Sequence, residues 1–193
     1  MAKYSFRVSL VSNYTKKLAE KYLPLIEKYC YKNNISVPLV LSIIHSESCF
    51  NPHALSPAGA MGLMQLMPQY GAKEAAEILH KSYSHEDLYK PELNIEFGIT
   101  YMHKLLNTEF GYLNDYLKIR HCAIAAYNCG PNRFNAQIKK IAGSKISEKE
   151  LYSYIKNLVP NETKHYLVDS VTQRIDGYKK WFNNKKHKNN LGG

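Results

Sequence analysis

The residue of this sequence best placed for chemistry is Glu47, near the end of an expected helix. Ser36 can cap that helix, and Pro38 suits its first turn because proline fixes φ and lacks an N–H. The helix would bury one apolar face, made by Leu39, Val40, Ile43 and Ile44. Glu47 lies three and four residues beyond the last two of these, so its carboxylate falls on the buried face.

Two features of this position favour a protonated Glu47. Apolar burial disfavours the charged form, and so does the negative end of the helix dipole in the last turn before Asn51 and Pro52. We therefore expect a raised pKa, each unit of which corresponds to about 1.4 kcal/mol. A carboxylic acid that stays protonated near neutral pH can act as a general acid. The alternative, which spacing alone favours, is a surface glutamate that closes its helix.

A loop rich in small residues, glycine and methionine follows this helix, over residues 51–68. Gly59 and Gly62 would let the backbone approach a ligand closely, because glycine has no side chain and tolerates positive φ. Neutral hydrogen-bonding groups and soft apolar side chains come from Ser56, Met64, Gln65 and Met67. This composition favours a ligand site beside Glu47.

Three motifs carry a resemblance to a known family. Residues 47–68 read ES-x-FNP-x-A-x-S-x-x-GA-x-GLMQ-x-MP, residues 126–131 read AYN-x-GP, and residues 162–167 follow E-T-x-x-Y-V with Leu167 in the place of valine. Cys129 stands where alanine is usual. The chain resembles the catalytic domain of lytic transglycosylases of the soluble-lytic-transglycosylase type, relatives of goose-type lysozyme. Among the branches of that family, the membrane-bound type C enzymes are closest in pattern.

The resemblance implies a mainly α, lysozyme-like fold with a central active-site groove. It implies Glu47 as the catalytic residue. The substrate-binding residues that it implies are Ser56, Met64, Gln65, Met67, Tyr127, Asn128, Glu162 and Tyr166. Taken alone, Tyr127 is equally well a buried tyrosine satisfied by a local carbonyl, and Glu162 a first-turn glutamate that complements a helix dipole. No cofactor or metal is expected, because His45 and Glu47 do not form H-E-x-x-H.

The family's reaction is lytic transglycosylation of peptidoglycan. It cleaves the MurNAc-GlcNAc β-1,4 bond and leaves 1,6-anhydro-MurNAc ends, with one glutamate as acid and then base. Hydrolysis ordinarily uses two carboxylates, and this sequence has no acidic residue between Glu47 and Glu74. The alternatives are a goose-type muramidase, which is a hydrolase, and a peptidoglycan-binding module without turnover. A basic nucleic-acid binder has the charge in its favour but no recognisable binding motif.

Helical periodicity predicts a chain that is helical almost throughout, with a first helix that Pro24 kinks or divides and a central core helix starting at Pro91. Strand-like alternation is confined to the stretch around residues 6–10. We expect an N-terminal arm over residues 1–12, one domain over residues 13–183, and a basic tail over residues 184–193, solvated or in contact with an anionic wall or membrane.

The formal charge of +10 indicates an anionic partner. Peptidoglycan, an acidic membrane surface and nucleic acid all fit that charge, and the motifs favour peptidoglycan, bound by a monomer. We expect a location in the periplasm or cell envelope. Residues 1–11 lack the apolar core of an export signal, so such a location requires a signal outside this sequence or another export route.

The cysteines leave two alternatives open. Cys30, Cys49, Cys122 and Cys129 show neither C-x-x-C spacing nor a metal pattern. They are either small buried thiols or partners in one or two disulfides. A bridge between Cys49 and Cys129 is conceivable because both lie within the site motifs.

Overall fold

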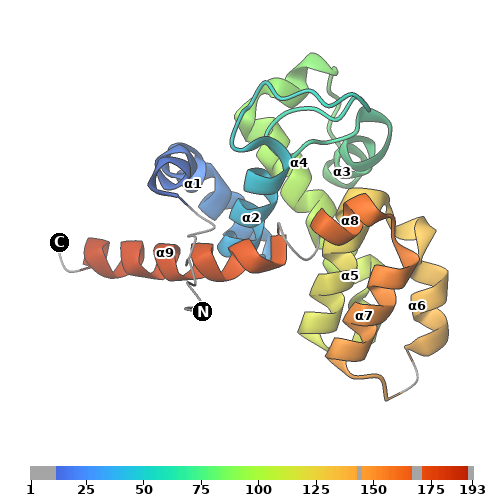
Figure 1. Ribbon diagram of the computed structural model, residues 1–193. Helices are drawn as coiled ribbons and strands as arrows, with labels where there is room; N and C mark the ends of the chain where they lie inside the picture. The colour runs from blue at the N-terminus through green and yellow to red at the C-terminus, as the bar shows by residue number, and fades with distance from the viewer. Residues whose placement is uncertain (1–11, 143–144, 167–170, 191–193) are drawn as a thin grey trace, which may run out of the picture.

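The computed structural model describes residues 12–142, 145–166 and 171–190, and these residues form helices and loops without a β-strand. In chain order the α-helices are α1 (Asn13–Asn33), α2 (Val37–Ser48), α3 (Lys73–Leu79), α4 (Pro91–Lys104), α5 (Tyr116–Cys129), α6 (Asn135–Ile141), α7 (Glu148–Leu158), α8 (Asn161–His165) and α9 (Gln173–Asn190) (Figure 1). Shorter π and 3-10 turns are η1 (Pro68–Ala72), η2 (Glu86–Tyr89), η3 (Leu105–Glu109), η4 (Gly111–Leu113) and η5 (Pro131–Arg133). The expectation of a mainly helical fold is confirmed. The strand-like stretch around residues 6–10 lies outside the described residues.

Helix α4 forms the centre of the molecule. Its residues from Asn94 to Met102 are all buried, which confirms the predicted core helix. Helices α1, α2 and α9 pack together on one side of it, and α5 to α8 form the other side (Figure 1). The loop after α2 and helix α3 cover one end of α4, between the two groups of helices. The junction between α2 and this loop, where Glu47 lies, is therefore near the middle of the fold.

Helix α2 has the bounds that its sequence predicts. Ser36 is its N-cap residue and Pro38 lies in its first turn, although the serine side chain makes no capping hydrogen bond. The helix ends at Ser48 because Cys49 adopts a left-handed conformation with φ 50°. Glu47 thus lies in the last turn, as expected.

Helix α1 continues unbroken through Pro24, so Pro24 does not divide it, which was one of the two predicted outcomes. A proline inside a helix removes one backbone hydrogen bond and costs about 3 kcal/mol in isolation. The neighbouring side chains of Tyr22, Leu23 and Ile26 are buried in the core. Their packing against α2 and α4 offsets that cost, which local sequence rules do not include.

The basic C-terminal segment is also more ordered than a solvated tail. Helix α9 runs to Asn190 and packs along α2, with Phe182 buried. Lys185 Nζ lies 2.9 Å from Glu20 Oε1 on α1, and Lys186 donates to the Tyr31 hydroxyl. Residues 184–190 therefore extend the helical domain. No described helix is both long enough and apolar enough to cross a lipid bilayer.

All four cysteines are free thiols. Burial raises the pKa of the Cys30 and Cys122 thiols to about 12, so both behave as small apolar side chains. Cys49 is exposed and Cys129 is half-buried.

Candidate active site

One buried amide, that of Asn94 on α4, holds the loop that follows Glu47. Its Oδ1 accepts the backbone N–H of Met64 at 2.8 Å. Its Nδ2 donates to the carbonyls of Met61 at 3.0 Å and Leu88 at 2.8 Å. Gly62 passes so close that a Cβ there would lie 2.3 Å from Asn94 Nδ2, and its φ is +78°. Only glycine suits this position. The close backbone approach predicted here was to a ligand, and the approach that the structure shows is to Asn94 and to the Leu88 carbonyl.

The side chain of Met64 points into the protein core. It is fully buried, and a Cβ on Gly98 of α4 would lie 2.3 Å from its sulfur. This differs from the role of ligand-contacting apolar surface expected for Met64. The reason is the close packing between the loop and α4, which the absence of a side chain at Gly98 allows.

The carboxyl group of Glu47 is set up as a weak acid. Burial raises its pKa to about 7, and the negative charge of Glu162 adds to the rise. The Tyr166 hydroxyl interacts with the carboxyl group and lowers the pKa in part. That hydroxyl is buried and makes no full hydrogen bond to any described residue. The raised pKa agrees with the expectation from helical spacing, and burial is its main cause.

Helix α9 fixes the last turns of α2 from behind. Arg174 donates from Nη1 to Ser46 Oγ at 2.7 Å, and the hydroxyl of Tyr178 lies 3.0 Å from His45 Nδ1. Burial, together with the Arg174 charge, lowers the pKa of His45 to about 4, so the imidazole is neutral at physiological pH. On the loop side, Ser48 Oγ donates to the Leu63 carbonyl at 2.8 Å. The residues on both sides of Glu47 are therefore bonded, Ser46 to helix α9 and Ser48 to the loop.

The end of α5 faces the loop through Tyr127 and Asn128. The Tyr127 hydroxyl donates to the Met64 carbonyl at 2.8 Å. A hydrogen bond to a carbonyl was one of the two alternatives that the sequence left open for this residue. Its pKa is raised well above the usual value by burial and by the Glu47 charge, which shows that the two side chains are neighbours. Asn128 Oδ1 accepts from Thr163 Oγ1 at 2.7 Å. This bond joins the second motif to the third.

Two further predicted residues serve the loop itself. Gln65 donates from Nε2 to the carbonyls of Ala54 at 3.0 Å and Gly62 at 2.9 Å, and its Oε1 accepts nothing from the described residues. Ser56 Oγ accepts the backbone N–H of Ala60 at 3.0 Å, and no described hydrogen bond joins it to Glu47. Glu162 is exposed in the first turn of α8, where it also complements the helix dipole.

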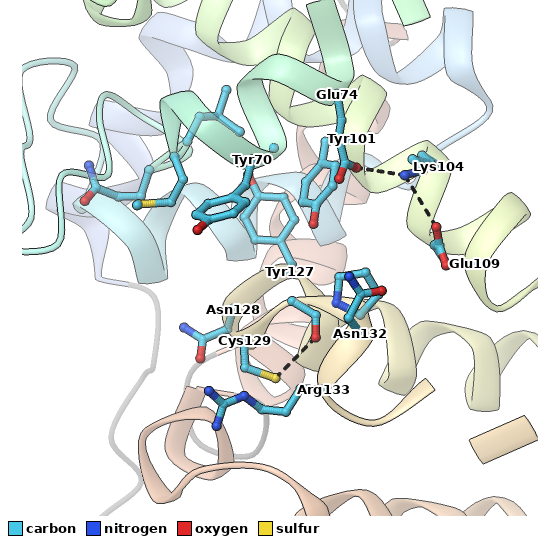
Figure 2. A pocket seen from close by; sticks show the side chains of 16 residues that line it. Tyr70, Glu74, Tyr101, Lys104, Glu109, Tyr127, Asn128, Cys129, Asn132 and Arg133 are labelled. Carbon is cyan, nitrogen blue, oxygen red and sulfur yellow. Dashed lines mark hydrogen bonds and ion pairs between the residues drawn. The ribbon is translucent and has the colours of Figure 1, made fainter. Parts of the chain in front are cut away.

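A cavity of about 720 Å³ lies beside these residues (Figure 2). Four predicted residues line it: Gln65, Met67, Tyr127 and Asn128. Lining side chains that the sequence reasoning missed are Tyr70, Glu74, Tyr101, Lys104, Glu109, Asn132 and Arg133. Lys104 Nζ bridges Glu74 Oε2 at 2.8 Å and Glu109 Oε1 at 3.4 Å. These three come from separate elements, so their sequence positions carried no signal of a shared site.

The described residues contain no group of three or more His, Cys, Asp or Glu side chains arranged to hold a metal ion. Glu47 itself does not line this cavity, but its neighbour Tyr127 does. The chemistry available is that of one carboxyl group with a raised pKa, next to the tyrosine wall of a cavity with aromatic, amide and charged side chains.

Comparison with known proteins identifies the family. The family model described as the transglycosylase SLT domain matches residues 24–150. The chain belongs to this family. Membrane-bound lytic murein transglycosylase C of Serratia proteamaculans is 32% identical over 174 residues, covering 86% of this chain and 49% of the relative. The protein of the same name from Yersinia pestis is 32% identical over 170 residues, covering 83% and 48%. The SLT chain thus spans about half the length of these relatives.

Solved structures share the fold of this SLT chain. The 70-kDa soluble lytic transglycosylase of Escherichia coli superposes with a TM-score of 0.67 at 30% identity, covering 86% of this chain and 25% of that one. A complex of the 70-kDa soluble lytic transglycosylase with bulgecin A gives 0.69 at 27% identity, covering 86% and 26%. The lytic transglycosylase Slt of Pseudomonas aeruginosa gives 0.72 at 24% identity, covering 86% and 25%. The lysozyme-like, mainly α fold class predicted from sequence is confirmed.

Proposed function

We propose that this chain is a peptidoglycan lytic transglycosylase that cleaves the MurNAc-GlcNAc β-1,4 bond and leaves 1,6-anhydro-MurNAc ends. The observation that carries the proposal is the Glu47 carboxyl group, whose pKa of about 7 leaves a substantial protonated fraction at neutral pH and a fully protonated group in mild acid. The family membership and the relatives' names, which are those of lytic murein transglycosylases, support the reaction and the substrate class.

The mechanism uses one carboxyl group twice. Glu47 donates its proton to the glycosidic oxygen, the bond to the anomeric carbon breaks, and positive charge develops on the sugar ring. The ionised Glu47 then removes the proton from the C6 hydroxyl of the same sugar, whose oxygen bonds to C1. Glu47 ends protonated again, and no water is consumed. A pKa near neutrality suits both steps, because it balances donation against acceptance.

The other predicted site residues take supporting roles in this proposal. Gln65, Tyr127 and Asn128 position the sugar, Met67 lines the site, and Glu162 borders the sugar groove. Ser56 shapes the loop through Ala60 and remains a candidate contact with substrate. Tyr166 contacts the substrate and tunes the Glu47 proton. For Met64 we propose a packing role, because its side chain is fully buried.

Hydrolysis, as in goose-type lysozyme, is the competing reaction. It needs a second carboxylate to act as base or nucleophile. Glu162 is the carboxylate whose charge acts on Glu47, and it is exposed on α8. Glu74 and Glu109 are both engaged by Lys104. Among the described residues, Glu162 is therefore the candidate second carboxylate of a hydrolytic mechanism.

Mass spectrometry of digested sacculi tests the proposal. Anhydro ends weigh one water less than the reducing ends that hydrolysis leaves, and we expect anhydro ends from this chain. Glu47→Gln keeps the shape and removes the proton, so activity should fall by about two to four orders of magnitude. Glu162→Gln should retain the same anhydro products. Reducing ends that vanish in Glu162→Gln would establish the muramidase instead, and turnover retained in Glu47→Gln would mean a different acid.

We also propose a location in the periplasm or cell envelope, where peptidoglycan lies, and action as a monomer without nucleic acid. The names of the relatives, which include the word membrane-bound, support the envelope. The charge of +10 fits the carboxylates of peptidoglycan or an anionic membrane. The exposed lysines near the end of α9, among them Lys179, Lys180 and Lys186, are the candidate contact. Sedimentation with anionic and with neutral vesicles, compared at low and high salt, tests the membrane arm.

A further inference from the structure

Tyr70 is a large aromatic side chain exposed on the wall of the cavity (Figure 2). It lies in η1 and is 65% exposed. Its backbone is fixed, because its N–H donates to the Met67 carbonyl at 3.1 Å and its carbonyl accepts from the N–H of Lys73. Its ring makes no aromatic contact and its hydroxyl no hydrogen bond with any described residue. A rigid backbone therefore presents an aromatic ring to the space that a ligand would fill.

The wall behind Tyr70 is itself aromatic. The next residue, Gly71, is buried, and a Cβ there would lie 3.1 Å from the ring of Tyr101. The Tyr101 ring in turn contacts that of Tyr127, with centroids 5.6 Å apart. Tyr127 is the neighbour of Glu47. A continuous series of packing contacts thus connects the backbone beside Tyr70 to Glu47, and these contacts fix the position of Tyr70 relative to the proposed acid.

The rim near Tyr70 is polar. Glu74 follows four residues later and lines the same cavity. Its Oε2 bonds Lys104, and its Oε1 accepts no hydrogen bond from the described residues. Asn128 and Asn132 add amide groups to the lining. A flat apolar face with carboxylate and amide groups at its edge is complementary to a sugar, which has an apolar face of C–H groups and an edge of hydroxyls.

We propose that Tyr70 is the platform on which one sugar ring of the glycan strand stacks, with Glu74 accepting hydrogen bonds from the hydroxyls of that sugar. This inference rests on the proposed function, because it assumes that a glycan enters the cavity. Tyr70 acts in binding and takes no part in proton transfer. Its removal therefore weakens the enzyme–glycan complex and leaves the chemical step largely unchanged.

The test separates ring stacking from simple apolar contact. Tyr70→Ala, Tyr70→Leu and Tyr70→Phe are each combined with Glu47→Gln, and binding of a peptide-free oligomer of N-acetylglucosamine is measured by calorimetry. We expect Kd to rise about three- to tenfold for the Ala and Leu variants and to stay unchanged for Phe. In the active enzyme the same rise should appear in KM, with kcat changed little. Tyr14→Ala is the matched control, since Tyr14 is 72% exposed on α1, outside the cavity.

Two results would overturn the inference. One is an unchanged Kd in Tyr70→Ala, and the other is a loss of affinity restricted to peptide-bearing strands, which would make the peptide the occupant. The proposed function fails on a different observation, the absence of anhydro ends from the wild-type digest. Because the oligomer binds without being cleaved in the Glu47→Gln background, the Tyr70 result stands independently of that outcome.

Discussion

At Glu47, three separate effects act on one proton. Burial raises the pKa of the carboxyl group, the Glu162 charge raises it further, and the Tyr166 hydroxyl lowers it. The last two come from α8 and from the residue that follows it, so the third motif tunes the acid supplied by the first. Because the proposed reaction starts from protonated Glu47, the alkaline limb of kcat/KM should report this pKa, near pH 7.

The two neighbours should shift that limb in opposite directions. Glu162→Gln removes a negative charge, so the pKa of Glu47 falls and the limb moves to lower pH. Tyr166→Phe removes the hydroxyl that favours the ionised form, so the pKa rises and the limb moves to higher pH. We expect shifts of about half to one pH unit, measured as kcat/KM on purified sacculi. Shifts of the same sign in both variants would contradict this account.

The raised pKa of Glu47 also carries a cost in stability. Its folded value of about 7 lies above the ordinary 4.5, so the unfolded chain releases this proton at lower pH than the folded chain does. The contribution of protonated Glu47 to the free energy of unfolding is fully present below pH 4.5 and is lost as the pH rises through 7. Glu47→Gln should therefore raise Tm by about 2–6 °C at pH 8 and leave it nearly unchanged at pH 4. Calorimetry of both proteins at the two pH values tests the sign, and Glu86→Gln on the exposed surface of η2 is the control.

At the scale of elements, the site depends on how α4 holds the loop of residues 49–68. The side-chain amide of Asn94, which is fully buried, hydrogen-bonds three backbone groups: the N–H of Met64 and the carbonyls of Met61 and Leu88. Gly62 and Gly98 let the chain approach α4 closely enough to make these contacts. Several residues of the first motif, over residues 47–68, therefore serve to pack the loop against α4 as well as to form the proposed binding site.

Replacing Asn94 should therefore disturb both stability and activity. Asn94→Ala removes the partners of the Met64 N–H and the Leu88 carbonyl in the interior, while the Met61 carbonyl keeps the N–H of Leu66, and we expect a cost of about 2–4 kcal/mol in the free energy of unfolding. Activity should fall as well, measured at a temperature where the variant stays folded. Asn107→Ala is the matched control, because Asn107 is exposed on η3 and, among the described residues, its side chain bonds only His103. An Asn94 variant as stable as the control would mean that other contacts hold the loop.

Local rules predicted the elements well where one helix decides the pattern. The spacing from Ser36 to Glu47 predicted α2 and its final turn. The predicted division of α1 at Pro24 is wrong because tertiary packing outweighs the local cost of the proline. The continuation of α9 past residue 183 was missed because lysines on a helix that packs by its other face look, in sequence, like a solvated tail.

The charged end of the cavity lay beyond sequence reasoning for another reason. Glu74, Lys104 and Glu109 are 30 and 5 residues apart in the chain, and each alone resembles an ordinary surface charge. Only the packing of α3 against α4 brings them together. The motif residues were found because a family pattern marks them, whereas these residues belong to no such pattern in the sequence.

At the scale of the whole molecule, two buried histidines should make the protein sensitive to acid. Burial lowers the pKa of His45 and of His121 to about 4, below the ordinary 6.5, while Glu148 Oε1, 3.0 Å from His121 Nδ1, acts in the opposite direction on His121. Between these values the unfolded chain binds protons that the folded chain does not, so stability falls as the pH drops from 6.5 to 4. The slope is up to about 1.4 kcal/mol per pH unit for each histidine.

Urea unfolding between pH 7 and pH 4 measures this slope. We expect the wild-type free energy of unfolding to decline on the acid side, and His121→Phe to flatten the decline, whatever its effect at pH 7. His53→Phe is the control, since His53 is exposed and its substitution should leave the slope unchanged. A decline equally steep in His121→Phe would assign the acid sensitivity to other groups.

The hydrogen bond from Tyr127 to the Met64 carbonyl has a consequence for the design of inhibitors. A phenol has one proton, and this one is already given away, so Tyr127 can only receive a hydrogen bond from a ligand. The Gln65 amide is similar, because its two protons go to the carbonyls of Ala54 and Gly62, so only Oε1 of this cavity-lining side chain stays available, as an acceptor. A tight-binding compound should therefore approach these two groups with N–H or O–H functions, and carbonyl or ether oxygens directed there should weaken it.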